Sequence, residues 1–194
     1  MIKSIDFYFD FISPYSYLAY YKLKSLKDYK EININFKPIL LGGLHKLGGI
    51  TAPAFNERKL KNMKDDCNLV AKKNKISFYW NSKFPINSLY LMRGYLAIDK
   101  NFKKKYFETC FDAYWKNNVD ISKDSKISKI LNNTGIDEKK FLSKIENIDI
   151  KEELKNLTNL AFEKNIFGAP TFVVNKKIFW GQDRLEYALD EYNS

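Results

Sequence analysis

One short stretch of the sequence places a hydroxyl group where it could do chemistry. Aromatic and β-branched residues fill positions 5–12 and predict a strand, and Ser13 and Pro14 follow as an N-cap and a first helical residue. A strand that runs into a helix leaves unpaired backbone N–H groups and the positive end of the helix dipole beside Ser13. Because its hydroxyl can donate one hydrogen bond, Ser13 could bind a phosphate, a carboxylate or a thiolate. An ordinary capped helix is the alternative for this stretch.

The two cysteines give no sign of redox chemistry. Cys67 and Cys110 are far apart and form no Cys-x-x-Cys pair, so neither a disulfide framework nor a dithiol site is expected. Two semi-buried free thiols are the simpler interpretation. The sequence predicts no metal site.

The composition is that of a globular protein with one domain, or with one domain that carries a large insertion. Of the 194 residues, 45% are hydrophobic and 16% are aromatic, which is enough for a substantial core. No apolar run approaches the roughly 20 residues that a membrane span needs. The N-terminal residues also lack the basic region and apolar core of a signal peptide, so we expect a cytoplasmic protein without a membrane partner.

The net charge of +10 raises the question of nucleic-acid binding. Only three of the 33 basic residues are arginines, and the lysines are scattered through almost every segment. No RNA- or DNA-binding motif accompanies them, and basic runs such as residues 103–105 are short. The charge therefore indicates solvated faces, and we expect no nucleic-acid partner.

Both ends of the chain predict α/β structure. After the first strand, a helix from Pro14 to about Leu26 leads to a second strand at 32–39, in which apolar and polar residues alternate. Strand, helix and strand in so short a segment predict a parallel βαβ unit. Near the C-terminus, residues 171–174 and 178–180 predict a hairpin, and a closing helix follows from Arg184 to about Tyr192.

The middle of the chain predicts helices. Residues 40–49 contain two Gly-Gly pairs and predict a loop. The helices expected after this loop are 54–75, 87–99, 102–117, 122–132, 137–147 and 151–165. The order β-α-β, helical insertion, β-β-α is that of an α/β thioredoxin-like fold. We therefore expect residues 1–40 and 165–194 to form a thioredoxin-like domain, and residues 41–164 to form a helical insertion domain over its active end.

Two positions of that fold carry a family resemblance. The turn after the first strand, where redox members have Cys-Pro-x-Cys, is Ser13-Pro14-Tyr15-Ser16, and the proline before the late hairpin is Pro170. With Phe7–Phe11, Phe167–Thr171 and Trp180–Leu185, these residues closely resemble 2-hydroxychromene-2-carboxylate isomerase and the kappa-class glutathione transferases, which belong to the DsbA-like thioredoxin-fold group. The resemblance covers essentially the whole chain.

The resemblance implies a site for glutathione, which would be the cofactor. Ser13 would donate its hydroxyl to the sulfur and favour the thiolate, and Ala169, before a cis Pro170, would pair its backbone with the cysteinyl part. Asp183 would bind the γ-glutamyl ammonium and Arg184 its carboxylate, with a plain N-cap and a solvated side chain as the alternatives. The residues expected to line the approach are Trp180, Gly181 and Gln182.

The first inserted segment departs from the family pattern. The usual Gly-Asn is Gly48-Gly49 here, so we expect an amide contact to the ligand to be absent. His45, the single histidine, is a candidate general base or carboxylate ligand, and a solvent-exposed loop residue is the alternative. Lys59 and Asn87 match family positions at the substrate cleft, with a surface lysine and an N-cap as their alternatives.

The resemblance suggests three functions. The first is a glutathione-dependent isomerase of the 2-hydroxychromene-2-carboxylate isomerase type, in which the thiolate adds reversibly to a conjugated, aromatic-derived substrate. The second is a kappa-class-like glutathione transferase that conjugates glutathione to electrophiles, and the third is a thioredoxin-fold protein that binds glutathione or a partner without turnover. Disulfide oxidoreduction is disfavoured because Ser13 and Ser16 offer no thiolate. Relatives are often dimers, so the resemblance also suggests a homodimer.

Overall fold

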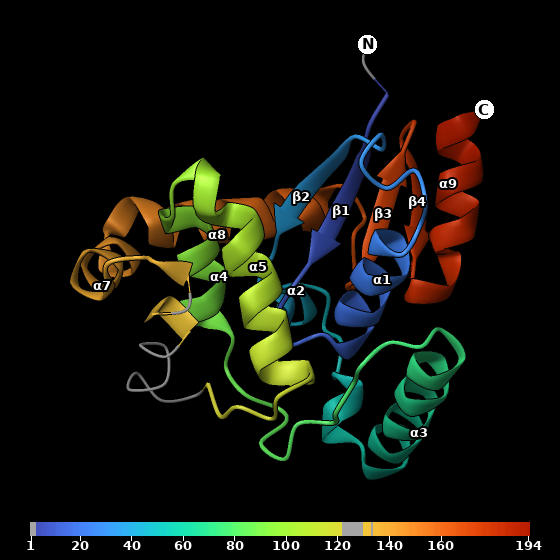
Figure 1. Cartoon of the computed structure of the whole chain (residues 1–194), viewed down its shortest axis with the longest axis horizontal. Helices are drawn as coiled ribbons and strands as arrows, with labels where there is room; N and C mark the ends of the chain where they lie inside the picture. Colours follow the sequence, from blue (N-terminus) through green and yellow to red (C-terminus); the bar gives the residue numbers. More distant parts are fainter. Residues whose placement is uncertain (1–2, 122–129, 133) are drawn as a thin grey trace.

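A four-stranded mixed sheet lies at the centre of the thioredoxin-like part (Figure 1). The computed structural model describes residues 3–121, 130–132 and 134–194. The strands are β1 (Ile5–Phe9), β2 (Ile34–Pro38), β3 (Thr171–Val174) and β4 (Lys177–Trp180), in the spatial order β2-β1-β3-β4. β1 pairs in parallel with β2 and antiparallel with β3, and β3 and β4 form an antiparallel hairpin. β1 therefore joins the two ends of the chain.

Two helices complete this part of the molecule. α1 (Pro14–Lys24) connects β1 with β2, as a parallel pair requires. After β4, the 3-10 turn η2 (Gln182–Arg184) leads into α9 (Leu185–Asn193), which packs on β3. η2 also contacts α1. The start of α1 and the C-terminal segment are thereby brought to the same end of the sheet.

The described residues between β2 and β3 form helices and their connections. In chain order these are α2 (Leu41–Leu47), the 3-10 turn η1 (Pro53–Phe55), α3 (Glu57–Lys73), α4 (Leu89–Ala97), α5 (Lys100–Trp115), α7 (Glu138–Glu146) and α8 (Ile148–Glu163). Figure 1 shows α3 next to α1, and α7 and α9 at opposite ends of the molecule. None of the helices in the described part of the chain is long and apolar enough to cross a membrane.

The core is aromatic and covers both faces of β1. Phe7 and Phe9 point to the face that α1 and α5 cover, where the rings of Phe9 and Phe107 lie edge to face with centroids 4.7 Å apart. Tyr8 points to the opposite face and packs near Leu44 of α2 and Ala161 of α8. Because β1 is held from both sides, the turn that follows it is fixed in place.

The expected α/β fold with a helical insertion is confirmed, but the loop expected at 40–49 is wrong. Residues 41–47 form α2, which packs against α8. Buried Leu44 supplies the apolar contact that stabilises this short helix in spite of its glycines.

Some helix boundaries also differ from expectation. α3 begins at Glu57 and not at residue 54, because Pro53–Phe55 forms a 3-10 turn and the Asn56 side chain accepts a hydrogen bond from Lys59 N at 3.0 Å. α8 begins at Ile148, three residues before the expected start. The helix expected at 122–132 lies mostly outside the described residues. The division into domains at residues 40 and 165 stays a prediction.

Candidate functional site

The Ser13 hydroxyl is held at the N-terminus of α1. Ser13 is the N-cap, with only 3% of its surface exposed, and Pro14 occupies the first helical position. The Ser13 Oγ accepts a hydrogen bond from Ser16 N at 3.1 Å and donates one to the Ala169 carbonyl oxygen at 2.8 Å. The expected capped helix is therefore present, and its cap also contacts a loop from the other end of the chain.

The side chain of the second serine of the turn takes no part in this contact. Ser16 is fully buried, and its Oγ has no hydrogen-bond partner among the described residues. Its backbone N–H, in contrast, is bonded to Ser13 Oγ. Of the two hydroxyls in Ser13-Pro14-Tyr15-Ser16, only that of Ser13 is placed to reach a ligand.

The loop before β3 lies against Ser13. The Ala169–Pro170 peptide bond is cis, as the resemblance implies. The Ala169 carbonyl already accepts the Ser13 hydroxyl, which leaves one lone pair for another donor. In the described part of the chain the Ala169 N–H donates to no acceptor. Ala169 thus presents a free backbone donor and a half-used acceptor beside a hydroxyl.

An exposed indole covers the same loop. Trp180, 54% exposed, packs on the Phe167 ring with centroids 4.9 Å apart. A Cβ on Gly168 would lie 2.5 Å from Trp180 Nε1, so this position needs glycine for the indole to pack as it does. The Thr171 hydroxyl donates to the Gly168 carbonyl at 2.7 Å and holds the loop in its bend.

Gln182 at the start of η2 points inward. The Lys22 ammonium donates to the Gln182 backbone carbonyl at 3.1 Å and to its side-chain oxygen at 3.3 Å, which ties η2 to α1. Gly181 N donates to the Pro170 carbonyl at 3.0 Å and ties the same segment to the loop before β3. The Gln182 oxygens are thus partly used by Lys22.

Asp183 and Arg184 follow on the surface as an ion pair. The guanidinium of Arg184 donates to Asp183 Oδ2 at 2.8 and 3.2 Å, and it lies over the Tyr187 ring at 4.9 Å. The N-cap alternative for Asp183 is wrong, because neither η2 nor α9 has a side-chain cap. A zwitterionic ligand could replace each partner with a group of the same charge.

A cleft of about 410 Å³ opens beside the Ser13 turn, between α1 and α3. Its lining consists of Tyr15, Pro53, Arg58, Lys59, Asn62 and Met63. Among the described residues, no carboxylate lies within ion-pair distance of Arg58 or Lys59. Two cations without a partner at the mouth of a cleft favour an anionic ligand. Lys59, a predicted substrate residue, is among the lining residues, and its role stays a prediction. Arg58 was not singled out from the sequence, where it stands among many basic residues.

Tyr15 connects the Ser13 turn with α3. Its side chain forms hydrogen bonds with Asp66 and Cys67, and burial is the main reason why the pKa of its hydroxyl is raised. The phenol therefore stays protonated at neutral pH, and its side chain lines the cleft. Its place next to Ser13 in the motif was the signal that could have identified it.

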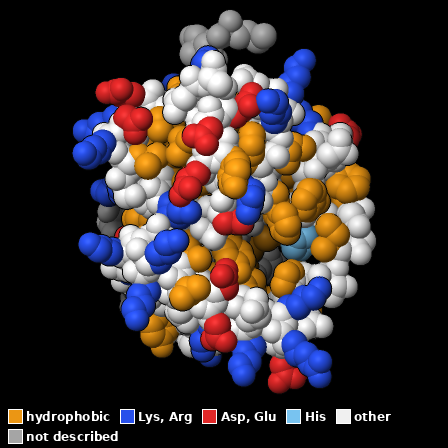
Figure 2. All heavy atoms as spheres, turned by 90° about the vertical axis from the view of Figure 1, so that its right-hand side faces the viewer, with side chains coloured by type: hydrophobic (Ala, Val, Ile, Leu, Met, Phe, Trp, Pro, Cys, Tyr) orange, Lys and Arg blue, Asp and Glu red, His pale blue; other side chains and the backbone are white. Residues whose placement is uncertain are grey.

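The two remaining candidates differ in their surroundings. His45 lies on α2, so the expectation of an exposed loop residue is wrong, and burial lowers the pKa of its imidazole. Figure 2 shows this single histidine beside a hollow in the molecular surface, with hydrophobic side chains around it. Asn87 is exposed, and its Oδ1 accepts a hydrogen bond from Leu89 N at 3.0 Å near the start of α4. It does not line the cleft.

Comparison with known proteins identifies the family. Residues 4–193, nearly the whole chain, match the family described as DSBA-like thioredoxin domain. The chain belongs to this family.

The relatives that are similar to this chain are of two kinds. The 2-hydroxychromene-2-carboxylate isomerase of Sphingobium xenophagum is 28% identical over 194 residues, with 99% of this chain and 98% of that protein covered. The Glutathione S-transferase kappa 1 of Homo sapiens is 25% identical over 199 residues, with 95% and 88% covered. A solved structure of a 2-hydroxychromene-2-carboxylate isomerase superposes with a TM-score of 0.88 at 25% identity, covering 97% of this chain and 94% of that one. Both kinds of relative are enzymes.

The two thiols of this DSBA-like chain lie in its interior. Cys67 and Cys110 are both fully buried and unpaired, and burial raises the pKa of both thiols. They are more buried than the semi-buried thiols expected from the sequence. Protonated, inaccessible thiols are poor nucleophiles, so they cannot replace the cysteines that are missing from the Ser13 turn.

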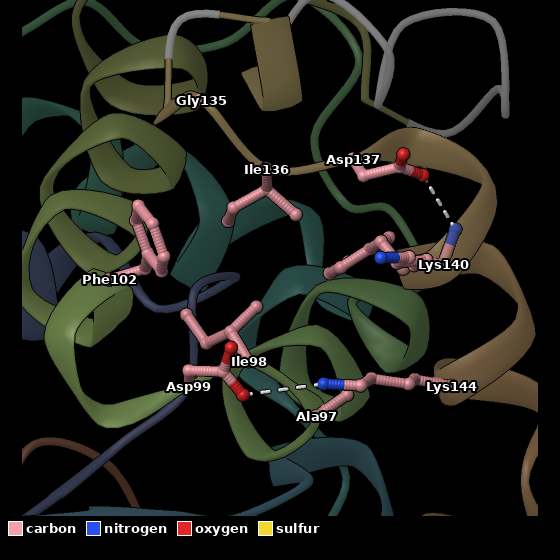
Figure 3. A pocket seen from close by; sticks show the side chains of 10 residues that line it. Ala97, Ile98, Asp99, Phe102, Gly135, Ile136, Asp137, Lys140 and Lys144 are labelled. Atoms are coloured by element: carbon pink, nitrogen blue, oxygen red, sulfur yellow. Dashed lines mark hydrogen bonds and ion pairs between the residues drawn. The ribbon is translucent and has the colours of Figure 1, made fainter.

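A second, smaller cavity lies far from this chemistry. Its volume is about 150 Å³, and Figure 3 shows Phe102, Ile98 and Ile136 around it. Asp99 accepts a hydrogen bond from the Lys144 ammonium at its rim, at 3.3 Å. None of the predicted site residues lines this cavity.

Proposed function

We propose that this protein is a glutathione-dependent isomerase of the 2-hydroxychromene-2-carboxylate isomerase type. The observation that carries the proposal is the contact of Ser13 Oγ with the Ala169 carbonyl at 2.8 Å, at the N-terminus of α1. It joins the one usable hydroxyl of the motif to the backbone loop that would pair with a peptide. No cysteine occupies this turn, so the nucleophile has to arrive with a ligand.

The residues of the site fit glutathione by their chemistry. The free Ala169 N–H and the remaining lone pair of its carbonyl suit the backbone of an extended peptide. Asp183 and Arg184 offer one charge of each sign, which suits an α-amino acid end. Trp180, Gly181 and Gln182 would line the approach between them, with the Gln182 oxygens partly used by Lys22.

Ser13 and α1 would activate the sulfur. When bound, glutathione supplies the thiol whose deprotonated form attacks a conjugated carbon of the substrate. The Ser13 hydroxyl would donate a hydrogen bond to that sulfur, and the helix N-terminus would add positive potential, so both favour the charged form. The protein would also hold the sulfur and the substrate close together and correctly oriented, which lowers the entropic part of the activation barrier.

The cleft beside Tyr15 supports an aromatic-derived substrate that carries an anionic group. Arg58 and Lys59 would bind the anion, and Met63 and Pro53 would contact its apolar part. His45, kept neutral by burial, is proposed as a proton acceptor near the substrate. Asn87 is a weaker candidate for the substrate site, because its Oδ1 already accepts a hydrogen bond from Leu89 N near the start of α4.

Glutathione transfer is the second candidate, and the human kappa-class relative favours it. Both reactions need the same activated sulfur, and they differ in whether glutathione is returned or kept in the product. A non-catalytic glutathione- or partner-binding protein is the third. Gly49 in place of the family asparagine is the feature that favours this last candidate.

One titration tests the proposal. Glutathione is added to the protein at neutral pH, and the ultraviolet absorption band of a thiolate is recorded for the wild type and for Ser13→Ala. We expect the band in the wild type and its loss in the variant. A wild type that binds glutathione without the band would support the non-catalytic candidate. Incubation with hydroxychromene carboxylates and haloaromatics then separates isomerase from transferase by the presence of a thioether product.

A cytoplasmic location and assembly as a homodimer complete the proposal. The unpaired Cys67 and Cys110 are typical of a reducing compartment. Exposed apolar side chains such as Phe55 and Leu69 would contribute to an interface. Sedimentation equilibrium over a range of concentrations decides between monomer and dimer.

A further inference from the structure

A buried carboxylate lies between β1 and the Ser13 turn. Asp10 directly follows β1, and none of its surface is exposed to solvent. Its backbone carbonyl accepts a hydrogen bond from Ser13 N at 3.0 Å. In the sequence, Asp10 stands among the aromatic residues of positions 5–12. A charged group is seldom fully buried unless its oxygens are satisfied by donors, so its contacts call for an explanation.

Both carboxylate oxygens of Asp10 accept backbone hydrogen bonds from separate segments. Oδ1 accepts from Ile12 N at 3.0 Å, within the turn that leads to Ser13. Oδ2 accepts from Leu41 N at 2.8 Å, at the first residue of α2. The Ser88 side chain, at the start of α4, also hydrogen-bonds the carboxylate. One side chain thus connects the turn with two helices of the insertion.

Neither of the two helices has a side-chain cap hydrogen bond from its own N-cap residue. α2 has no side-chain cap of its own, since its N-cap is Leu40. Ser88 is the N-cap of α4 and makes no capping hydrogen bond, while its side chain contributes to the pKa of Asp10. Burial raises the pKa of the Asp10 carboxyl, and the hydrogen bonds from Ile12, Leu41 and Ser88 oppose this.

We propose that Asp10 is a positioning residue for Ser13: its carboxylate fixes the Ile12–Ser13 turn against α2, so that the Ser13 hydroxyl stays in line with Ala169. The inference rests on the proposed function for its catalytic meaning, but its structural content can be tested without any ligand. Asp10 does not touch the sulfur. It acts by restricting the backbone that carries the hydroxyl.

The Ser16 amide reports the position of Ser13 directly. As the third residue of α1, Ser16 has no acceptor within the helix, and its N–H is bonded to Ser13 Oγ. If Ser13 moves, this amide loses its partner and exchanges its hydrogen faster. A loss of global stability would instead speed the exchange of amides throughout the protein.

The experiment measures amide hydrogen exchange by NMR in the ligand-free protein. The variant is Asp10→Asn, which keeps the size but turns an NH₂ group toward one of the two backbone N–H donors. Ser13→Ala removes the acceptor of the Ser16 amide, so its Ser16 exchange rate is the reference for an amide without this hydrogen bond. Asp6→Asn is the matched control, because Asp6 lies on β1 just before this turn but accepts a hydrogen bond from Asn35 and pairs with Lys37.

We expect Ser16 exchange to be about three- to tenfold faster in Asp10→Asn, the effect of losing one hydrogen bond of ordinary strength. Amides of α5 should keep their wild-type rates, and Asp6→Asn should match the wild type. Ser16 exchange at the wild-type rate in Asp10→Asn would overturn the inference. If that variant does not fold, Ser88→Ala removes one donor to the same carboxylate, and a Ser16 rate raised by less than about twofold would overturn the inference instead.

A double-variant cycle tests the catalytic part. If Asp10 acts through Ser13, then Asp10→Asn lowers kcat about tenfold and leaves glutathione affinity within about threefold, and Ser13→Ala combined with Asp10→Asn is no slower than Ser13→Ala alone. Additive losses would mean that Asp10 contributes by another route. A wild type without glutathione chemistry would refute the proposed function but would leave the exchange result standing.

Discussion

Replacing Ser13 with alanine separates its structural role from its chemical role. In the folded protein the hydroxyl accepts one hydrogen bond, from Ser16 N, and donates one, to the Ala169 carbonyl. Loss of a helix cap costs about 0.5–2 kcal/mol, and loss of a buried hydrogen bond costs about 0.5–1.5 kcal/mol. We expect the free energy of unfolding to fall by about 2 kcal/mol in total, since water cannot reach a site that is only 3% exposed.

The functional loss should exceed what this destabilisation explains. A hydrogen bond to a charged group is worth about 1.5–3 kcal/mol, so the pKa of the bound thiol should rise by about one to two. Turnover should fall by about tenfold to a hundredfold, with glutathione affinity within a few-fold of the wild type. Thermal unfolding gives the first quantity, with a Tm lower by about 4–8 °C. Ultraviolet titration and steady-state kinetics give the others.

The chain supplies its own control for this experiment. Ser16 is buried in the same turn, and its hydroxyl has no partner among the described residues. Ser16→Ala removes an unsatisfied polar group, so it should leave both turnover and the bound-thiol pKa unchanged, with stability equal or slightly higher. If Ser16→Ala loses as much turnover as Ser13→Ala, or if Ser13→Ala keeps wild-type turnover, the assignment of the sulfur to Ser13 is refuted.

Three further predictions concern the thiols, the histidine and the altered loop. Cys67→Ala with Cys110→Ala should keep full glutathione-dependent activity, and neither the wild type nor the double variant should reduce insulin disulfides; activity lost while the fold is retained would contradict this. Burial lowers the pKa of His45 below its usual 6.5, so the unfolded chain binds its proton more tightly, and stability should rise as the pH increases through that window up to about 6.5. The Tm of His45→Gln, measured across the same pH range, should lack this rise, and parallel curves would show that His45 does not titrate as stated. Gly49→Asn should fold normally, because the φ of +63° suits asparagine and no atom lies within 4 Å of the added Cβ. Calorimetry should then show tighter glutathione binding if the missing amide was a ligand contact, and an unchanged Kd would separate this loop from the site.

The sequence was most informative where local chemistry decides the structure. Ser13 and Pro14 marked the end of β1 and the start of α1, and the hairpin of β3 and β4 followed from its own alternation of residues. Both depend on caps and turns that lie within a few residues. The order of these elements then led to the thioredoxin-like fold.

Features that depend on distant partners could not be predicted in this way. α2 contains Gly42 and Gly43, which favour a loop, but Asp10 caps it from 31 residues away and Leu44 packs it against α8. The role of Arg58 likewise depends on where α3 lies relative to Tyr15. Local propensity is overruled in such places by tertiary contacts.

The hydroxyl of Ser13 has only one proton, and in the free protein the Ala169 carbonyl holds it. A thiolate must therefore compete with a carbonyl for that proton, and its affinity is lowered by the bond it displaces. A thioether competes poorly, because its sulfur is a weak acceptor. Once the sulfur carries a carbon substituent, the Ser13 hydroxyl again donates its hydrogen bond to the Ala169 carbonyl. The bond that weakens binding of the thiolate therefore favours release of the conjugate. The net preference for the thiolate is the bond to the charged sulfur, about 1.5–3 kcal/mol, less the displaced bond of about 0.5–1.5 kcal/mol. The difference of about 1 kcal/mol favours the thiolate over the conjugate by roughly five- to tenfold.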